Sequence, residues 1–211
     1  HPTLPLVGLE PANKPALAVT KTGHVGVIGT RGTLTSAKFG KLMASLAGQA
    51  HFVVQPCDGL AHAIERSVTQ PAPVPGSAVG ATEAGALCER YLQAMGDFGT
   101  APGQMDTLVL GCTHYIFAAH TLQALVGPDV QLIETGEPVA RQTRRLLEAA
   151  GLLHAPTGLP NDGKTPQEEN TPEQAPPRIR LLTTGPVAML QAAAQRWLDL
   201  PASCSETFSV L

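Results

Sequence analysis

Short apolar runs alternate along this chain with amphipathic segments of helical length, and this alternation restricts the folds that the chain can adopt. Each apolar run is short enough to be a buried strand, and the segments between runs are long enough for helices. Parallel strands need such helical connections, whereas antiparallel strands can be joined by tight turns. The alternation therefore predicts an α/β protein whose parallel sheets are covered by helices on both faces.

The pattern also gives approximate bounds for each element. The predicted strands cover residues 4–9, 25–28, 52–55, 107–110, 130–133 and 178–182. The predicted helices cover residues 12–20, 36–46, 59–68, 82–95, 137–150 and 186–198, and a further helix starts beyond Tyr115. Thr35 or Ser36 and Thr82 suit helix caps, and Pro186 suits a first helical position, where its missing N–H costs nothing. Residues 71–80 and the proline-rich residues 155–177 are predicted to be loops.

Composition limits the partners and the location of the protein. Hydrophobic residues make up 43% of the chain, which is enough for a packed core. The net charge is −3 and no stretch concentrates lysine or arginine, which argues against nucleic acid or an anionic membrane as a partner. No apolar run reaches the roughly 18 residues of a membrane span, and residues 1–12 do not resemble a signal peptide. We therefore expect a cytoplasmic protein.

The cysteines point to a reduced environment and to no metal site. They are far apart and form no CxxC pair, so neither a zinc site nor a disulfide framework is predicted; they are Cys57, Cys88, Cys112 and Cys204. Free cysteine is among the most buried residue types, so each of the four has a structural interpretation as a core residue. Cys57 follows Pro56 with nothing basic placed to activate it, which favours that interpretation.

Cys112 differs from the other cysteines in its neighbours. It follows an apolar strand and Gly111, which permits a tight turn, and it precedes Thr113 and His114. Backbone N–H groups and a helix dipole at this point favour negative charge, and both effects lower the pKa of a thiol from its free value of about 8.5. His114 is placed to supply a proton or to stabilise a thiolate, and Thr113 to hold a carboxylate.

Two chemistries remain open for this motif. Cys112 acts either as a nucleophile with His114 as its base, as in a hydrolase or acyl-transferase, or as an acid and base that exchanges a proton with a carbon atom. The motif alone does not decide between them. Five other histidines have no partner at motif spacing and are given no role; they are His24, His51, His62, His120 and His154. The turn at residues 29–33 lacks both the GxGxxG spacing and the P-loop lysine.

The Cys112 segment is one of several motifs that occur in a recognisable order. The others are residues 7–11 with 14–16, the Gly-Thr-containing residues 25–33, residues 55–65 ending in Glu65, residues 135–141 and residues 183–185. Together they resemble the glutamate racemases over nearly the whole chain. Two positions depart from that pattern. Ile116 stands where the family commonly has proline, and Glu134-Thr135-Gly136 replaces Asp-Ser-Gly.

The resemblance implies racemisation by two cysteines that face each other across the substrate. One thiolate removes the α-proton of L- or D-glutamate and the opposite thiol protonates the other face, with no cofactor and no metal. It assigns one of these cysteines to Cys112, an assisting role to His114 and Glu65, and substrate binding to Thr113 and Gly111. From the residues alone, Glu65 is only a surface acid.

The resemblance also implies the organisation of the protein. Two doubly wound parallel-sheet domains are expected, with residues 22–117 forming the second and residues 1–21 and 118–205 an incomplete, discontinuous first. The family's other cysteine lies in a Cys-Asn-Thr motif that this chain lacks, and the chain begins with His1. We therefore expect a longer protein, and no activity from this chain alone. The implied product is D-glutamate for peptidoglycan synthesis. Aspartate racemase is the alternative within the class. A homodimer is a possible assembly.

Overall fold

The computed structural model describes residues 6–71, 76–153 and 179–209. The chain divides into two compact units, His1–Thr143 and Arg144–Leu211. The predictions made for residues 4 and 5, for Arg178 and for the loop at residues 155–177 lie outside the described residues. Among those that are described, no helix has the length and hydropathy needed to cross a bilayer.

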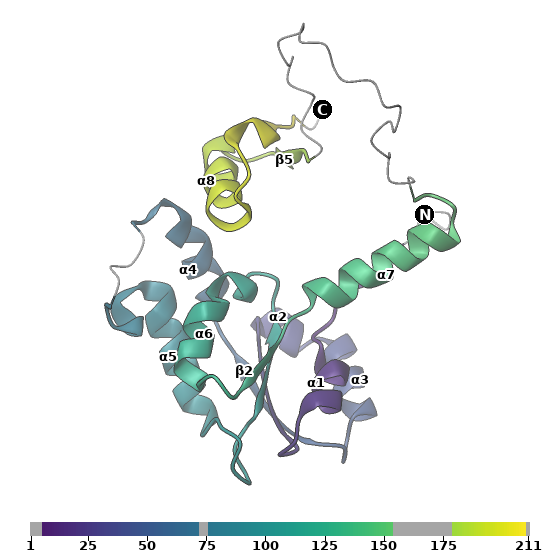
Figure 1. Cartoon of the computed structure of the whole chain (residues 1–211), viewed down its shortest axis with the longest axis vertical. Helices are drawn as coiled ribbons and strands as arrows, with labels where there is room; N and C mark the ends of the chain where they lie inside the picture. Colours follow the sequence, from purple (N-terminus) through teal and green to yellow (C-terminus); the bar gives the residue numbers. More distant parts are fainter. Residues whose placement is uncertain (1–5, 72–75, 154–178, 210–211) are drawn as a thin grey trace, which may run out of the picture. The chain divides into compact units, whose positions relative to one another are not determined.

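A four-stranded parallel sheet forms the centre of the first unit (Figure 1). Its order is β2-β1-β3-β4, with strands β1 (His24–Gly29), β2 (His51–Pro56), β3 (Thr107–Gly111) and β4 (Gln131–Ile133). Strand β1 pairs with β2 on one side and β3 on the other, and β3 also pairs with β4. Because all four strands are parallel, their carboxyl ends lie along the same edge of the sheet.

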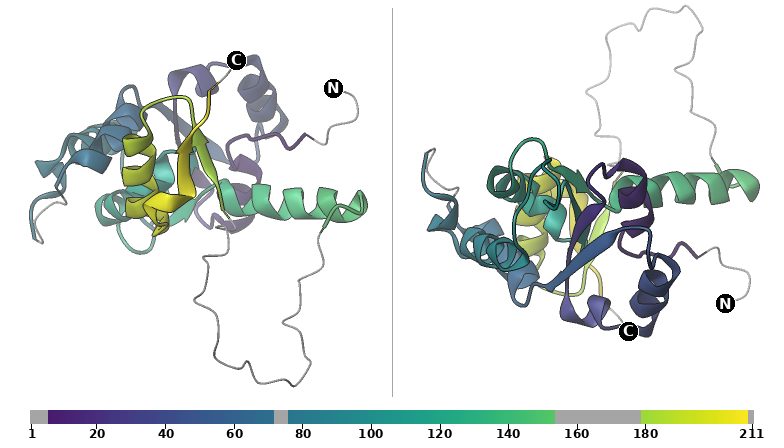
Figure 2. Two further views of the ribbon diagram at one scale, coloured as in Figure 1. Left: turned by 90° about the horizontal axis from the view of Figure 1, so that it is seen from above. Right: turned by 90° about the horizontal axis from the view of Figure 1, so that it is seen from below.

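Helices cover both faces of this sheet (Figures 1 and 2). On one face, α1 (Asn13–Val19) and α3 (Ala37–Ser45) pack against Val25 and Val27 of β1 in one apolar cluster. The alternate residue Gly26 faces the other side, where it approaches Met95 of α5 (Glu83–Met95). The remaining helices of this unit are α2 (Arg31–Leu34), α4 (Leu60–Arg66), α6 (Ala119–Val126) and the 3-10 turns η1 (Ser67–Thr69), η2 (Val79–Ala81) and η3 (Tyr115–Ala118). The predicted α/β class with parallel sheets is confirmed.

Two of the predicted helix caps are present. The Ser36 hydroxyl accepts a hydrogen bond from Phe39 N at 3.1 Å at the start of α3. The Thr82 hydroxyl accepts one from Gly85 N at 3.0 Å at the start of α5. Each side chain satisfies a backbone N–H that the first helical turn would otherwise leave without a partner.

The second unit contains a smaller parallel pair. Strand β5 (Leu181–Thr183) pairs with β6 (Ser205–Thr207), and α8 (Val187–Leu198) and the turn η4 (Ala202–Cys204) lie between them in sequence. Helix α7 (Gly136–Ala149) crosses the division between the units. Pro186 is the N-cap of α8 rather than its first residue, one position away from the prediction.

One predicted strand is absent from the structure. Residues 6–9 belong to no strand, and Leu6 is 83% exposed, so the buried strand predicted at residues 4–9 is wrong over the part that is described. The first compact unit extends beyond residue 117 to Thr143 and includes β4, which pairs with β3. The discontinuous domain expected from residues 1–21 and 118–205 stays a prediction.

Candidate active site

Cys112 lies at the carboxyl end of β3, directly after a glycine that the packing requires. A Cβ atom added to Gly111 would lie 2.7 Å from the carbonyl oxygen of Ile28 and 3.3 Å from the ring of Pro11. Gly111 is therefore buried between two backbone segments, while Cys112 is only partly buried. The close approach of these segments explains why residue 111 is a glycine. The expected contact of Gly111 with substrate stays a prediction.

The backbone after Cys112 turns tightly and is held by a buried tyrosine side chain. The N–H of Tyr115 donates to the carbonyl oxygen of Cys112 at 3.1 Å. The Tyr115 side chain is fully buried, and its hydroxyl donates to the carbonyl oxygen of Cys57 at 3.3 Å. This contact connects the end of β3 with the loop after β2, so Cys112 sits on a fixed turn.

His114 and Glu65 form a chain of contacts that ends at the thiol. The Sγ atom of Cys112 lies 3.7 Å from Nδ1 of His114, and Nε2 of His114 lies 2.7 Å from a carboxylate oxygen of Glu65. Glu65 comes from α4, far away in sequence. The His114 side chain is 33% exposed and that of Glu65 56%. The three residues expected to act together thus lie together at the carboxyl edge of the sheet.

His62, a histidine that was predicted to be incidental, extends this series of contacts. Nδ1 of His62 lies 4.0 Å from the second carboxylate oxygen of Glu65, one helical turn away on α4. The i,i+3 spacing of His62 and Glu65 was visible in the sequence. His62 was nevertheless predicted to be incidental, because no partner at motif spacing was recognised for it.

The pKa of Cys112 is raised above that of an ordinary thiol, contrary to the expected lowering. Burial is the main cause, because it removes water from the charged form, and the negative charge of Glu65 adds to it. The backbone N–H groups of His114 and Tyr115 act in the expected direction and lower the pKa, but they do not outweigh burial. The turn after Cys112 is also a short 3-10 helix, with α6 starting only at Ala119, so no long helix begins at the thiol.

A pocket of about 230 Å³ opens beside Cys112. Its lining consists of Leu9, Leu110, Cys112, Thr113, Ile116, Glu134, Thr135, Gly136 and Val139. Thr113 is exposed there, as a residue that contacts a ligand must be. Glu134 accepts hydrogen bonds from the N–H groups of Gly136 and Glu137, so its carboxylate is held at the start of α7. The sequence showed a motif at residues 134–136 but not that it would line this pocket.

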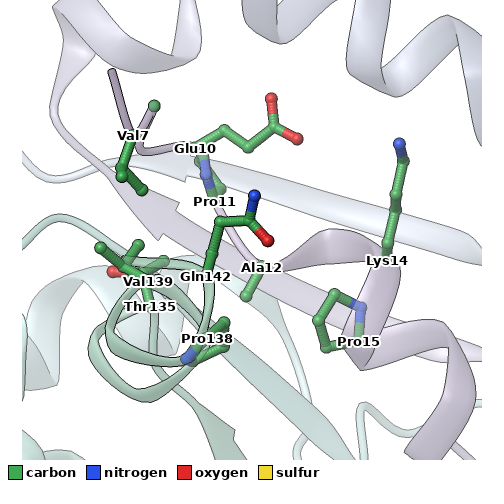
Figure 3. Close-up of a pocket in the computed structure, with 11 residues that line it drawn as sticks. Val7, Glu10, Pro11, Ala12, Lys14, Pro15, Thr135, Pro138, Val139 and Gln142 are labelled. Carbon is green, nitrogen blue, oxygen red and sulfur yellow. The ribbon is translucent and has the colours of Figure 1, made fainter. Parts of the chain in front are cut away.

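A second pocket, of about 180 Å³, lies between the segment before α1 and the first turns of α7 (Figure 3). Pro11, Ala12, Pro15 and Pro138 form much of its lining. Figure 3 also shows the polar end groups of Glu10, Lys14 and Gln142 around this lining. This pocket contains neither the thiol nor His114, but it shares Thr135 and Val139 with the pocket beside Cys112, so the two pockets adjoin.

The other cysteines are buried in the core. Burial raises the pKa of Cys57 and that of Cys88 to about 12, and Cys204 is only 5% exposed. A thiol is a nucleophile or a base only as the thiolate, so Cys57 and Cys88 are unreactive near neutral pH in the folded protein. The structural role predicted for Cys57 fits this environment. In the part of the chain that is described, no group of three or more His, Cys, Asp or Glu side chains is arranged to hold a metal ion.

Curated proteins with similar sequences are glutamate racemases. The chain is 44% identical over 154 residues to that of Pseudomonas putida, a match that covers 72% of this chain and 52% of the relative. It is 41% identical over 157 residues to that of Herpetosiphon aurantiacus, covering 74% and 56%. The chain thus spans about half the length of the curated relatives that it matches. No family model matches the chain.

Solved structures with the same fold bear the same name. Glutamate racemase from Escherichia coli, solved with L-glutamate and an activator, superposes with a TM-score of 0.67 at 23% identity, over 99% of this chain and 66% of that one. An isoform from Bacillus anthracis gives 0.63 at 25% identity, over 93% and 61%. The E. coli structure supports the fold, and the sequence matches give the relationship. On these grounds, the chain belongs to the glutamate racemase family.

Proposed function

We propose that this chain is part of an enzyme that interconverts L- and D-glutamate, with Cys112 as the acid and base on one face of the substrate. The proposal rests on the names of the curated relatives and on the bound L- and D-glutamate named for two of the similar structures. Peptidoglycan synthesis in the cytoplasm is the proposed use of the D-glutamate. No organic cofactor takes part in the proposed reaction.

The observation that carries the proposal is the contact chain from Cys112 through His114 to Glu65. Because the pKa of Cys112 is raised, its resting form is the neutral thiol, which is the form that donates a proton to a carbanion. To remove a proton instead, Cys112 must first lose its own. His114 is close enough to accept it, and the Glu65 carboxylate then stabilises the imidazolium.

The substrate is proposed to lie in the pocket beside Cys112. Thr113 lines this pocket and offers a hydroxyl to a ligand. The pocket volume of about 230 Å³ is below the range of about 300–1,000 Å³ that is typical of pockets for larger ligands, which suits a substrate as small as glutamate. Stabilising the carbanion requires hydrogen bonds to the substrate carboxylate and exclusion of water. Aspartate racemisation remains the alternative within this class.

A hydrolase or acyl-transferase is the second candidate, and the same geometry favours it. A cysteine, a histidine and a carboxylate in sequence also form the arrangement used for nucleophilic attack on acyl groups. That reaction leaves an acyl group on Cys112 and does not exchange the α-hydrogen of glutamate. The two functions therefore make opposite predictions for acylation of Cys112 and for exchange of the α-hydrogen of glutamate.

The test joins this chain to the part of the Pseudomonas putida relative that lies outside the match. In D₂O, this protein is expected to exchange the α-hydrogen of both glutamate enantiomers for deuterium, measured by NMR. Cys112→Ala is expected to abolish exchange of the enantiomer whose α-hydrogen faces Cys112, and the matched variant Cys204→Ala to retain exchange of both enantiomers. Binding of glutamate in a calorimeter without any exchange would contradict the proposal. A covalent adduct of Cys112 with an activated ester, again without exchange, would favour the second candidate.

A further inference from the structure

Two histidines lie side by side at the amino end of the first sheet, opposite to the end that holds Cys112. His24 and His51 begin β1 and β2 and are direct partners in the parallel register. Register partners point to the same face of a sheet. Their ring centroids are 5.2 Å apart and the ring planes are inclined by 52°. Only the fold brings the two residues together, because β1 and β2 are separated by α2 and α3.

The hydrogen bond of His24 determines which ring nitrogen is available. Nδ1 lies 3.0 Å from the carbonyl oxygen of Thr22. A carbonyl oxygen can only accept, so Nδ1 carries the proton. In the neutral ring, Nε2 is then left with a free lone pair. A backbone carbonyl in this position is also what commonly orients the histidines that ligate metal ions.

The carbonyl group that orients His24 is itself held in place. The buried carboxylate of Asp106 accepts hydrogen bonds from Lys21 N at 2.6 Å, from Thr22 N at 2.9 Å and from the Thr20 hydroxyl at 2.6 Å. Burial raises the pKa of Asp106, but the hydrogen bonds outweigh burial and the net shift is downward, so the carboxylate stays charged. The turn that presents the Thr22 carbonyl is therefore rigid, as a preorganised ligand site requires.

The distance between the rings matches that of two ligands on one tetrahedral ion. With a metal–nitrogen distance of about 2.0–2.1 Å and a ring radius of about 1.1 Å, each centroid lies about 3.2 Å from the ion, and two rings at a tetrahedral angle lie about 5.2 Å apart. His24 is partly buried and His51 exposed, so an ion can enter from solvent. Within the described residues, neither ring takes part in an ion pair that would compete.

We propose that His24 and His51 bind one divalent transition-metal ion, of which Zn²⁺ is the best fit, with water completing its coordination. Imidazole nitrogen suits Zn²⁺, Ni²⁺ and Cu²⁺, whereas Mg²⁺ prefers oxygen. The ion joins the first residues of β1 and β2, so it stabilises the folded state. The site is independent of the proposed racemase activity, because it lies at the other end of the sheet.

The test measures Zn²⁺ binding to the 211-residue chain by calorimetry, together with the shift in melting temperature that Zn²⁺ causes. His24→Ala and His51→Ala are each expected to weaken binding by at least about tenfold, as expected when a ligand is lost, and to remove the rise in melting temperature. Binding to the native state alone raises this temperature, so the shift reports a site that the fold creates. Mg²⁺ is expected to cause no shift.

Two matched variants test an isolated histidine and the accessible thiol as other ligands of Zn²⁺. His120→Ala removes an exposed histidine on helix α6, which belongs to no paired strand. Cys112→Ser removes the accessible thiol. Both are expected to bind Zn²⁺ as the unmodified chain does. Equal affinity in the His24 or His51 variant would overturn the proposal. Should either variant fail to fold, NMR of the unmodified chain decides: Zn²⁺ must shift the ring signals of both His24 and His51, and unshifted signals refute the site.

Discussion

At the scale of single residues, the opposing influences on Cys112 decide how the thiol behaves. Burial and the negative charge of Glu65 favour the neutral form, while two backbone N–H groups favour the thiolate. Glu65 also accepts a hydrogen bond from His114, which needs a negative partner when it takes up a proton. The same carboxylate thus adds to the effect of burial, which keeps the thiol protonated at rest, and prepares its neighbour to receive the proton.

The pH dependence of Cys112 alkylation tests this balance. Because the pKa is raised, the thiolate fraction is small near neutral pH, and the rate of reaction with iodoacetamide is expected to rise with a midpoint above the ordinary thiol value of about 8.5. Glu65→Gln removes a negative charge, so the midpoint is expected to move to lower pH. Mass spectrometry of the alkylated peptide measures the rate at this residue.

A matched charge change on another helix provides the control. Glu83 on α5 pairs with Arg66 and is not among the groups that shift the pKa of Cys112. Glu83→Gln is therefore expected to leave the midpoint unchanged. A midpoint that stays constant or rises in Glu65→Gln would show that Glu65 does not act on the thiol through its charge.

How much of the candidate site can be predicted depends on how local each contact is. Cys112, Thr113 and His114 are adjacent, so one motif after a predicted strand identified them. The partnership of His114 with Glu65 joins β3 to α4 and depends on the strand order, which no local pattern contains. The net effect of burial on the thiol was likewise missed, since exposure is a property of the packed molecule.

At the scale of elements, buried strands and capped helices were predictable and isolated apolar runs were not. Strand β3 is buried along its whole length, and a continuous apolar run of this kind is typical of a strand in a parallel sheet. Residues 6–9 are as apolar as a strand but form none, because a strand exists only where another strand pairs with it. Strand β6 was missed for the opposite reason: it is short and polar, and pairing with β5 alone defines it.

Two glycines in helices make a matched test of packing against helix propensity. Gly85 is buried in the first turn of α5, where an added Cβ would collide with the carbonyl oxygen of Val79. Gly40 is exposed in α3, with open space around its Cα. Gly40→Ala is expected to raise the free energy of unfolding by about 0.4–1 kcal/mol, because alanine restricts the unfolded chain and favours the helix.

Gly85→Ala is expected to lower the free energy of unfolding, although the residue change is the same. The 3-10 turn η2, which contains Val79, would have to move away from α5 to make room. Overpacking of this kind typically costs about 1–3 kcal/mol. Urea unfolding followed by circular dichroism measures both variants. A stabilising effect of Gly85→Ala would mean that η2 is not held against α5 in solution.

At the scale of the whole molecule, the strand order gathers residues that the sequence separates. With β1 between β2 and β3, the segments after all three strands meet at one edge, which places Glu65 beside His114. The same order brings the amino ends of β1 and β2 together and pairs His24 with His51. Both features follow from parallel topology and were invisible to motif spacing. The division after Thr143 follows likewise from β4, whose place in the sheet only pairing reveals.

Two-sided proton transfer needs a second thiol on the opposite face of the substrate. Cys112 is the only partly exposed cysteine in the described residues, whereas Cys57, Cys88 and Cys204 are buried. The thiolates of Cys57 and Cys88 form only near pH 12, so neither serves as the second acid and base at neutral pH. The 211-residue chain is therefore expected to leave the optical rotation of L-glutamate unchanged. Rotation that declines with this chain, and stops declining with Cys112→Ala, would show that one cysteine suffices and would refute the two-cysteine account while keeping Cys112 catalytic.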